Sequence, residues 1–321
     1  MIALGVLVLA QAAAGGPSPA YRDLVERYRR GEQAAVTTGA LPALPAALDA
    51  SFPFEAAVLL HTDRAMAAAA RGGDELEELG RALLLTRRMP PERRRAFAPR
   101  WLRVPVLRLC RQARWPQAFG LLNEGLGLRH DDPELLMLRG AVIESQLRMG
   151  PALRGAAVAK VVAVPFDVNW TGAEALYRRV LAARPDLTEA RLRLGRVRQL
   201  LTRGRDTVEL QAVAKGAATP DQLYLAHLFL GAAFEQKGDE AGAAAEFEAA
   251  ARAFPGTQSA AVALSHARRR AGEWEAAASA LGEGLATPGA PLRRDPWWAY
   301  QAGQAEDADA LLDSLRAEVR Q

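Results

Sequence analysis

The chain has 321 residues, more than a single hydrophobic core usually holds, so we expect two domains or one elongated repeat array. Half of the residues are apolar, which excludes wholesale disorder, and 68 alanines with only 6% aromatic residues exclude a β-sandwich or a β-barrel. The 41 basic side chains, 38 of them arginine, and the 37 acidic ones leave a formal charge of +4, a skew that indicates a GC-rich genome rather than a function.

Residues 1–16 differ from the rest of the chain because the apolar run from Ile2 to Ala14 carries no charged side chain. The run is too short to cross the roughly 30 Å core of a bilayer as a helix. Its length and the A-x-A triplet that begins at Ala10 favour a secretory signal peptide. No Lys or Arg precedes the run, so a disordered N-terminus or a misplaced start codon remains an alternative. We expect a bacterial protein exported to the periplasm, or a cytoplasmic one if the run is not a signal peptide.

Residues 17–98 are predicted to form divergent helical hairpins. An apolar stripe with the helical spacing i, i+3, i+4, i+7 consists of Tyr21, Leu24, Val25 and Tyr28. The helix that carries this stripe is expected to stop at Gly31. A Pro/Ala linker at 41–45 then leads to two further predicted helices at 54–70 and 74–88, the second with Asp74 as its expected N-cap.

Residues 81–115 are strongly basic, with eleven arginines and a single acidic residue, Glu92. The predicted basic surface on one helical face consists of Arg100, Arg103, Arg111 and Arg114. Such a face attracts phosphates, anionic lipid headgroups or an acidic protein, although a solvated arginine face in an arginine-rich protein is the competing interpretation. No aromatic platform is interleaved with these arginines, so we do not expect nucleic acid as a partner.

An internal repeat is visible in the second half of the chain. Residues that share their type and spacing recur 70 positions apart, with Ala173, Tyr177, Val180 and Pro185 returning as Ala243, Phe247, Ala250 and Pro255. The pair Leu194-Gly195 recurs 36 positions later as Leu230-Gly231. Small residues let two helices approach closely, an aromatic ring fills the gap to the next hairpin, and proline ends the helix. The pattern therefore predicts stacked helical hairpins.

These residues resemble the tetratricopeptide repeat (TPR) family, whose pattern is W-x2-L-G-x2-Y followed by A-x3-F-x2-A-x4-P. The closest unit, residues 224–257, carries Leu230, Gly231, Phe234, Gly238, Ala243, Phe247, Ala250 and Pro255 in the family spacing and has His227 in place of the tryptophan. The unit at 258–291 departs further, with Ser265 for the glycine and Arg268 for the tyrosine. The resemblance covers residues 99–291 and implies an all-α fold, a right-handed α-solenoid of stacked hairpins.

The resemblance also implies a concave groove lined by the first helix of each hairpin. The positions that would face this groove are Leu192, Arg196, Gln199, Leu228, Ala232, Glu235, Val262, His266 and Arg269. The Lys and Asn residues with which some family members clamp a carboxylate have no counterpart at these positions. We expect a peptide or protein ligand held by Arg196, His266 and Arg269.

Two segments depart from a simple array. About 20 extra residues near 150–170 form a predicted insertion, either a projecting loop or an additional buried helix. At the C-terminal end, residues 292–321 are predicted to form a capping helix whose apolar stripe includes Leu311, Leu312 and Leu315. The residues Trp297, Trp298 and Tyr300 are expected to seal the last groove, with a ligand-binding aromatic cage as the alternative.

The sequence contains no recognisable catalytic or metal-binding motif such as H-E-x-x-H, G-x-S-x-G or a phosphate loop. A single cysteine, Cys110, excludes an intramolecular disulfide, and its apolar neighbours predict a buried, inert thiol. The calcium-loop-like segment that begins at Asp167 has Arg178 where the bidentate glutamate belongs, so we reject calcium. We predict no enzyme, no cofactor and no metal. The predicted function is a protein- or peptide-binding scaffold, with anion binding through residues 81–115 as the alternative.

Overall fold

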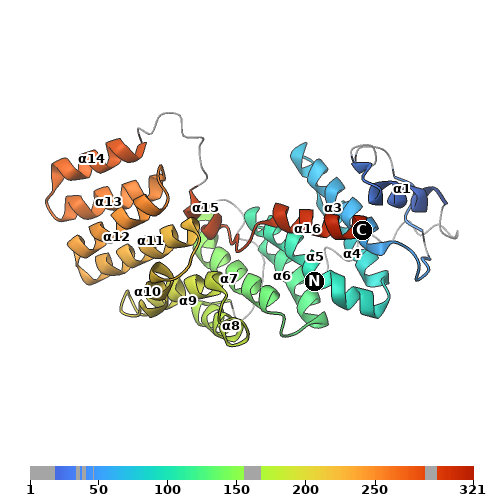
Figure 1. The fold of residues 1–321 in the computed structure, drawn as a ribbon, viewed down its shortest axis with the longest axis horizontal. Helices are drawn as coiled ribbons and strands as arrows, with labels where there is room; N and C mark the ends of the chain where they lie inside the picture. Colours follow the sequence, from blue (N-terminus) through green and yellow to red (C-terminus); the bar gives the residue numbers. More distant parts are fainter. Residues whose placement is uncertain (1–18, 34–36, 38–40, 46, 155–167, 286–294) are drawn as a thin grey trace. The chain divides into compact units, whose positions relative to one another are not determined.

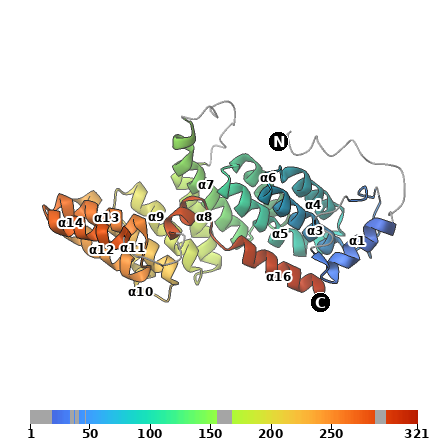
Figure 2. The same cartoon turned by 90° about the horizontal axis from the view of Figure 1, so that it is seen from above.

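The structure is a computed structural model that describes residues 19–33, 37, 41–45, 47–154, 168–285 and 295–321. All regular secondary structure in these residues is helical, and neighbouring helices stack as hairpins (Figure 1, Figure 2). This arrangement confirms the predicted fold class, an all-α solenoid of TPR-like hairpins. The predicted signal peptide and residues 155–167 of the predicted insertion lie outside the described residues.

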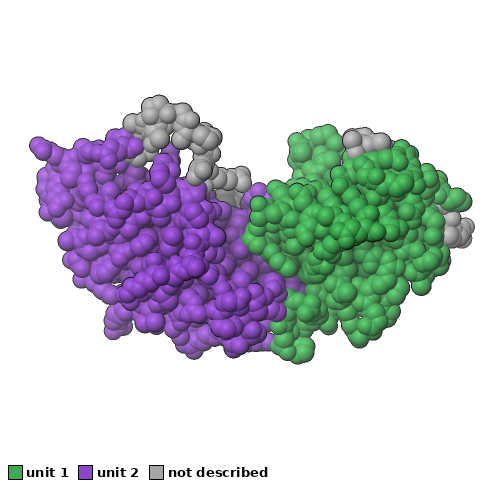
Figure 3. Space-filling view, viewed as in Figure 1, with its two compact units in different colours: residues 1–109, 116–132, 306–321 green, residues 110–115, 133–305 purple. Residues whose placement is uncertain are grey.

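The chain divides into two compact units (Figure 3). Unit 1 comprises residues 1–109, 116–132 and 306–321, and unit 2 comprises residues 110–115 and 133–305. The predicted domain boundary at residue 98 lies inside one helix of unit 1, and the predicted C-terminal segment 292–321 is divided between the two units.

Unit 1 is built on a central hairpin. Its helices are α1 (Pro19–Arg29), α3 (Phe54–Ala70), α4 (Leu76–Arg88), most of α5 (Pro91–Arg111), most of α6 (Trp115–Leu128) and α16 (Ala308–Arg320). Helices α3 and α4 pair, and both α1 and α16 pack against α3. Three residues of the stripe on α1, Tyr21, Val25 and Tyr28, are buried, and Tyr21 stacks on Phe52, just before α3, with the ring centroids 6.0 Å apart. Helix α4 begins at Leu76 with Glu75 rather than Asp74 at the N-cap position, and the Asp74 side chain accepts a hydrogen bond from Leu76 N at 3.0 Å.

The C-terminal helix α16 does not cap the last repeat, contrary to our prediction. It belongs to unit 1, where it buries Leu312 and Leu315 and contacts α3. Arg316 on α16 forms an ion pair with the buried Asp63 of α3. The sequence correctly indicated the apolar stripe of this helix. An apolar stripe shows that a helix packs against an apolar surface, but it does not identify the element that provides this surface.

A buried histidine links α1, α3 and α4 in unit 1. His61 is 1% exposed, its Nδ1 lies 2.5 Å from Glu78 Oε2, and its Nε2 lies 2.9 Å from the hydroxyl of Tyr21. Neutral imidazole satisfies both contacts when Nδ1–H donates to Glu78 and Nε2 accepts from Tyr21. Burial lowers the pKa of His61 below its ordinary 6.5 and outweighs the opposite effect of Glu78. The imidazole is therefore uncharged in the folded protein at neutral pH.

This histidine predicts acid sensitivity. Below about pH 6.5 the unfolded chain binds a proton at His61 that the folded chain does not bind, so the free energy of unfolding is highest above that pH and decreases as the pH falls. Between about pH 7.5 and pH 5.5 we expect wild type to lose more stability than the His61→Gln variant, by at most about 1.4 kcal/mol per pH unit. Urea titrations at both pH values measure the difference.

The matched control is His130→Gln, because the His130 side chain is 87% exposed. This control is expected to keep the pH dependence of wild type. Equal losses in wild type and in His61→Gln would contradict the role of the buried imidazole.

The described residues of unit 2 form four hairpins and one short additional helix. Its helices are α7 (Pro133–Arg154), α8 (Trp170–Ala183), α9 (Thr188–Leu201), α10 (Val208–Lys215), α11 (Pro220–Lys237), α12 (Glu240–Ala253), α13 (Gln258–Arg270), α14 (Trp274–Leu285) and α15 (Pro296–Gln301). Each helix from α7 to α14 contacts the next one in the chain, and α9 also contacts α11. The helices α7, α9, α11 and α13 are thus the first helices of the hairpins.

Local sequence signals set the ends of these helices. Helix α11 begins with a capping box in which Thr219 accepts from the Gln222 backbone and Gln222 bonds back to Thr219, and it ends at Gly238 with φ 76°. Helix α8 begins where the Asn169 side chain accepts a hydrogen bond from Gly172 N at 2.7 Å. Asn169, part of the calcium-like segment, is therefore a helix N-cap.

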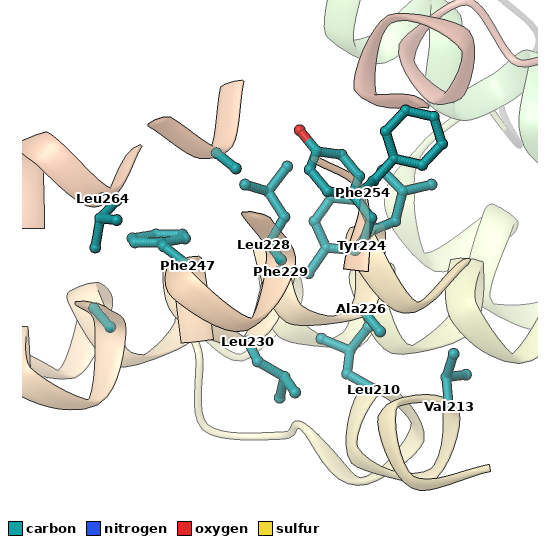
Figure 4. Close-up of a cluster of buried hydrophobic side chains, with 14 of the residues drawn as sticks. Leu210, Val213, Tyr224, Ala226, Leu228, Phe229, Leu230, Phe247, Phe254 and Leu264 are labelled. Atoms are coloured by element: carbon teal, nitrogen blue, oxygen red, sulfur yellow. The ribbon is translucent and has the colours of Figure 1, made fainter. Parts of the chain in front are cut away.

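In two hairpins of unit 2, α7/α8 and α11/α12, a glycine faces an aromatic ring. A Cβ atom added at Gly140 of α7 would lie 2.6 Å from the ring of Tyr177 on α8. One added at Gly231 of α11 would overlap the ring of Phe247 on α12, which is 2% exposed (Figure 4). Only glycine allows the helices to approach this closely. These contacts explain why glycine and an aromatic residue recur at fixed spacing in the sequence.

Candidate functional site

The candidate site is the face that the first helices α7, α9, α11 and α13 form together, here called the first-helix face. Contacts between these helices make the face continuous. Gln199 of α9 donates to Gln236 of α11 at 2.8 Å, and Glu235 of α11 lies 3.1 Å from Nδ1 of His266 on α13. Part of this face is covered by α15, which contacts α7 and α11.

Helix α15 is held on the first-helix face by aromatic side chains. The ring of Tyr300 lies 5.0 Å from the ring of Phe229, and Trp297 stacks on Tyr300 with an interplanar angle of 8°. The guanidinium of Arg196 on α9 lies 4.6 Å from the ring centre of Phe229 and 6.0 Å from that of Trp297. Trp298, one residue further, is 59% exposed. Two of the three aromatic residues therefore point into the face and one points to solvent.

A buried polar cluster receives the hydroxyl of Tyr300. Glu144 on α7 is 1% exposed and accepts hydrogen bonds at 2.6 Å from the hydroxyls of both Tyr300 and Tyr177. Arg193, which is fully buried, lies 3.4 Å from Glu144 and 2.7 Å from Glu189. Burial, and then the charge of Glu144, raises the pKa of Tyr300, so its hydroxyl stays protonated and donates.

The first residue of the covering segment is fixed by its carboxylate. Asp295 is buried, and its Oδ1 accepts from the hydroxyl of Tyr224 at 2.9 Å and from Trp297 N at 2.9 Å. Its Oδ2 accepts from Ser259 N at 3.0 Å. Asp295 therefore serves as the N-cap of α15 and also ties this helix to α11 and α13.

The last residue of the covering segment approaches the only cysteine of the chain. Gly303 has φ 67°, and a Cβ atom there would lie 2.7 Å from Cys110 Sγ and 3.1 Å from the carbonyl oxygen of Ala141. Cys110 is 1% exposed, and burial raises the pKa of its thiol to about 11, so it is unreactive in this state. Residues 295–303 thus form one continuous covering segment on the first-helix face.

The predicted groove residues fall into two groups. On α9 and the start of α11, Leu192, Gln199 and Leu228 are buried, and Arg196 is half-buried beneath Trp297. Burial, together with the neighbouring Arg148, lowers the pKa of Arg196 to about 9, which still leaves it charged at neutral pH. The α9 part of the predicted groove is therefore occupied by the chain itself.

The second group lies open. On α11, Ala232 and Glu235 are half-buried, and on α13, Val262, His266 and Arg269 are exposed. Val262 is 54% exposed and gives this group an accessible apolar side chain. The face beyond α15 is therefore an accessible stripe with two apolar side chains, one histidine and two charged side chains.

Sequence reasoning placed the aromatic residues of α15 in the wrong groove. Trp297 and Tyr300 seal the stretch beside α7, α9 and α11, not the end of the array. It also missed Glu144 and Arg193, which look like ordinary surface charges of a helix. The signal that could have found them is their spacing, because both stand where a helical stripe calls for an apolar residue.

The predicted basic surface is not a single helical face. Helix α5 ends at Arg111, so Arg114 lies beyond it, and Arg111 belongs to unit 2. Within unit 1, Arg100 forms a two-pronged ion pair with Glu318 of α16, and Arg103 pairs in the same way with Glu306. Arg114 also has an interaction partner, whereas Arg111 is exposed. Acidic residues of the C-terminal segment thus neutralise the centre of the basic segment.

A pocket in unit 1 offers no better site. It is lined by residues of α1, α3, α5 and α16, and its charged side chains pair with each other, Arg93 with Glu55 and Arg100 with Glu318. Across the described residues, no three His, Cys, Asp or Glu side chains come together as a group able to hold a metal ion. The described helices also include none that is both long and apolar enough to span a bilayer.

Fold and site together define a TPR-like array of helical hairpins with a partly occupied binding face. No protein-family model matches the chain, and no curated protein matches it. Among solved structures, a MamA fragment that starts at residue 41, from Desulfovibrio magneticus RS-1, has a TM-score of 0.44 and 19% identity over 59% of this chain and 94% of its own. A MamA AMB-1 structure has a TM-score of 0.39 and 19% identity over 60% of this chain and 93% of its own. These values describe a loose likeness in fold and carry no argument about function.

Proposed function

We propose that this protein is a non-enzymatic protein-interaction scaffold that binds a segment of a partner protein on the first-helix face of unit 2. The observation that carries the proposal is α15, because this face already holds a short helix through aromatic ring contacts, cation–π contacts and hydrogen bonds. Beside α15, the stripe of Glu235, Val262, His266 and Arg269 is accessible and supplies both charge and apolar area. Helix-in-groove binding uses this combination of an apolar contact and flanking charges.

The repeat pattern supports the related proposal that the chain is a divergent member of the TPR family. The apolar run before residue 17 supports the proposal that the protein is bacterial and exported to the periplasm. Neither proposal is needed for the binding face, whose geometry stands on unit 2 alone.

Site-specific photo-crosslinking tests the binding face. A photo-reactive amino acid at Val262 on α13 is expected to capture a discrete partner in cells that produce the protein naturally. The matched control places the same amino acid at Arg252 on α12, which is 71% exposed but lies on a second helix. The His266→Glu/Arg269→Glu variant is expected to reduce the adduct at position 262 at least tenfold. Identical adducts at 262 and 252, or none at 262, would contradict the proposed face.

A further inference from the structure

We infer that residues 295–303 are an intramolecular ligand of the first-helix face, and that the partner carries a short helix of the same chemistry. That helix begins with Asp-Pro, has a tryptophan two residues after the aspartate and a tyrosine three residues later. The inference rests on the proposed function and specifies its partner. The covering segment shows what each position of such a helix must supply.

The first position requires a carboxylate. Asp295 is met on both oxygens by groups from two different helices, the hydroxyl of Tyr224 on α11 and Ser259 N on α13. A buried carboxylate with such partners fixes the register of the helix that follows it, because a shift by one residue leaves Tyr224 and Ser259 N without an acceptor. Pro296 in the first turn then favours the helical conformation.

The third and sixth positions require electron-rich rings. Arg193 lies 4.5 Å from the ring centre of Tyr300 and Arg148 lies 5.3 Å from it. Arg196 lies 4.6 Å from the ring centre of Phe229 and 6.0 Å from that of Trp297. Three guanidinium groups thus face these rings, while only Glu144 and Glu189 are present to balance them in the described cluster. Arg193 Nη2 is buried without a hydrogen-bond partner among the described residues. This surplus of cations favours the electron-rich faces of aromatic rings. Glu144 in addition requires a hydrogen-bond donor, which the tyrosine hydroxyl supplies and phenylalanine lacks.

The covering segment has the properties of an exchangeable occupant. Its helix has only six residues, and isolated helices shorter than about 12 residues are marginal in water, so α15 depends on this face for its structure. A tethered segment competes with an effective concentration on the order of 1 mM. A free ligand with a Kd of about 10 µM is therefore expected to bind wild type about 100-fold more weakly than a protein whose own segment has been disabled.

Peptide binding tests the inference on the full-length chain. The probe is a fluorescent peptide with the sequence of residues 295–304, and the opened variant is Trp297→Ala/Tyr300→Ala. Fluorescence polarisation is expected to show binding to the opened variant and about 100-fold weaker binding to wild type. A peptide with alanine in place of Trp298 should bind equally well, since Trp298 points to solvent. A peptide with alanine in place of Trp297 and Tyr300 should not bind, and Arg196→Glu in the opened variant should abolish binding of the parent peptide.

The reactivity of Cys110 is a second measure of whether residues 295–303 cover the first-helix face. Because Gly303 covers Cys110 Sγ, a maleimide should modify this thiol slowly in wild type and faster in the opened variant, and saturating peptide should slow the reaction again. This protection also shows that the opened variant is folded at the site. If the opened variant does not fold, Tyr300→Phe replaces it, since this variant loses only the hydrogen bond to Glu144 and must bind the peptide more tightly than wild type.

Equal affinities of wild type and the opened variant would overturn the inference, as would a folded opened variant that neither binds the peptide nor protects Cys110. The outcome is separable from the proposed function. Peptide binding without a crosslink at Val262 would contradict the proposed partner-binding face on α13 but would support residues 295–303 as an intramolecular ligand. A crosslink at Val262 without peptide binding would contradict the inference about residues 295–303 and would leave the proposed function supported.

Discussion

Replacing Glu144 by alanine is expected to lower the free energy of unfolding by about 3–5 kcal/mol, the range observed when one partner of a buried ion pair is removed. In unit 2 this carboxylate accepts from two tyrosine hydroxyls and lies beside Arg148 and the fully buried Arg193. The alanine variant leaves both hydroxyls without an acceptor and Arg193 with Glu189 alone. Urea titration measures the loss, and hydrogen exchange of α7, α9 and α15 locates it in unit 2.

The Glu144→Gln variant keeps the shape and one acceptor oxygen, so we expect a smaller loss, about 1–2 kcal/mol. The surface control is Glu92→Ala, because the Glu92 side chain is 86% exposed and its ion-pair partner Arg95 is 63% exposed. Its stability should equal that of wild type. A Glu144→Ala variant as stable as the Glu92→Ala control would show that the buried cluster does not hold α15.

Replacing Phe247 by alanine is expected to cost about 3–5 kcal/mol, because the ring is buried and the helices around it cannot close the cavity fully. Phe247 belongs to a continuous cluster of side chains from α9 to α14 that includes Leu228, Leu230 and Leu264 (Figure 4). Denaturant titration measures the effect. The control is Trp274→Ala on α14, since Trp274 is 66% exposed and its removal leaves no cavity.

A double-mutant cycle with Gly231 tests the contact itself. Gly231→Ala alone is expected to cost about 1–3 kcal/mol, because its methyl group would overlap the Phe247 ring. In the Phe247→Ala background the same methyl group enters the vacated space, so the two losses should not add. Additive losses of stability would show that the absence of a side chain at Gly231 is not what makes room for the Phe247 ring.

The candidate site was only partly predictable. The positions on α13 were predicted from the register of the repeat, and Val262, His266 and Arg269 are exposed, whereas their binding role stays a prediction. The positions on α9 were predicted by the same rule, but the rule gives no information on whether a face is already covered. Leu192 and Gln199 are buried, and Arg196 lies 6.0 Å from the ring of Trp297 in the covering segment.

The sequence by itself determined the hairpins of this protein. Glycine, an aromatic residue, alanine and proline at fixed spacing define which helices pair, because those contacts join segments close in the chain, such as Gly231 and Phe247. Only the tertiary structure decided where the C-terminal segment goes. Tyr300 meets Glu144 across 156 positions, and α16 meets α3 rather than the last hairpin. Such contacts depend on complementary surfaces that no local period encodes, because an amphipathic helix or an aromatic pair can be buried against any surface of matching shape and charge.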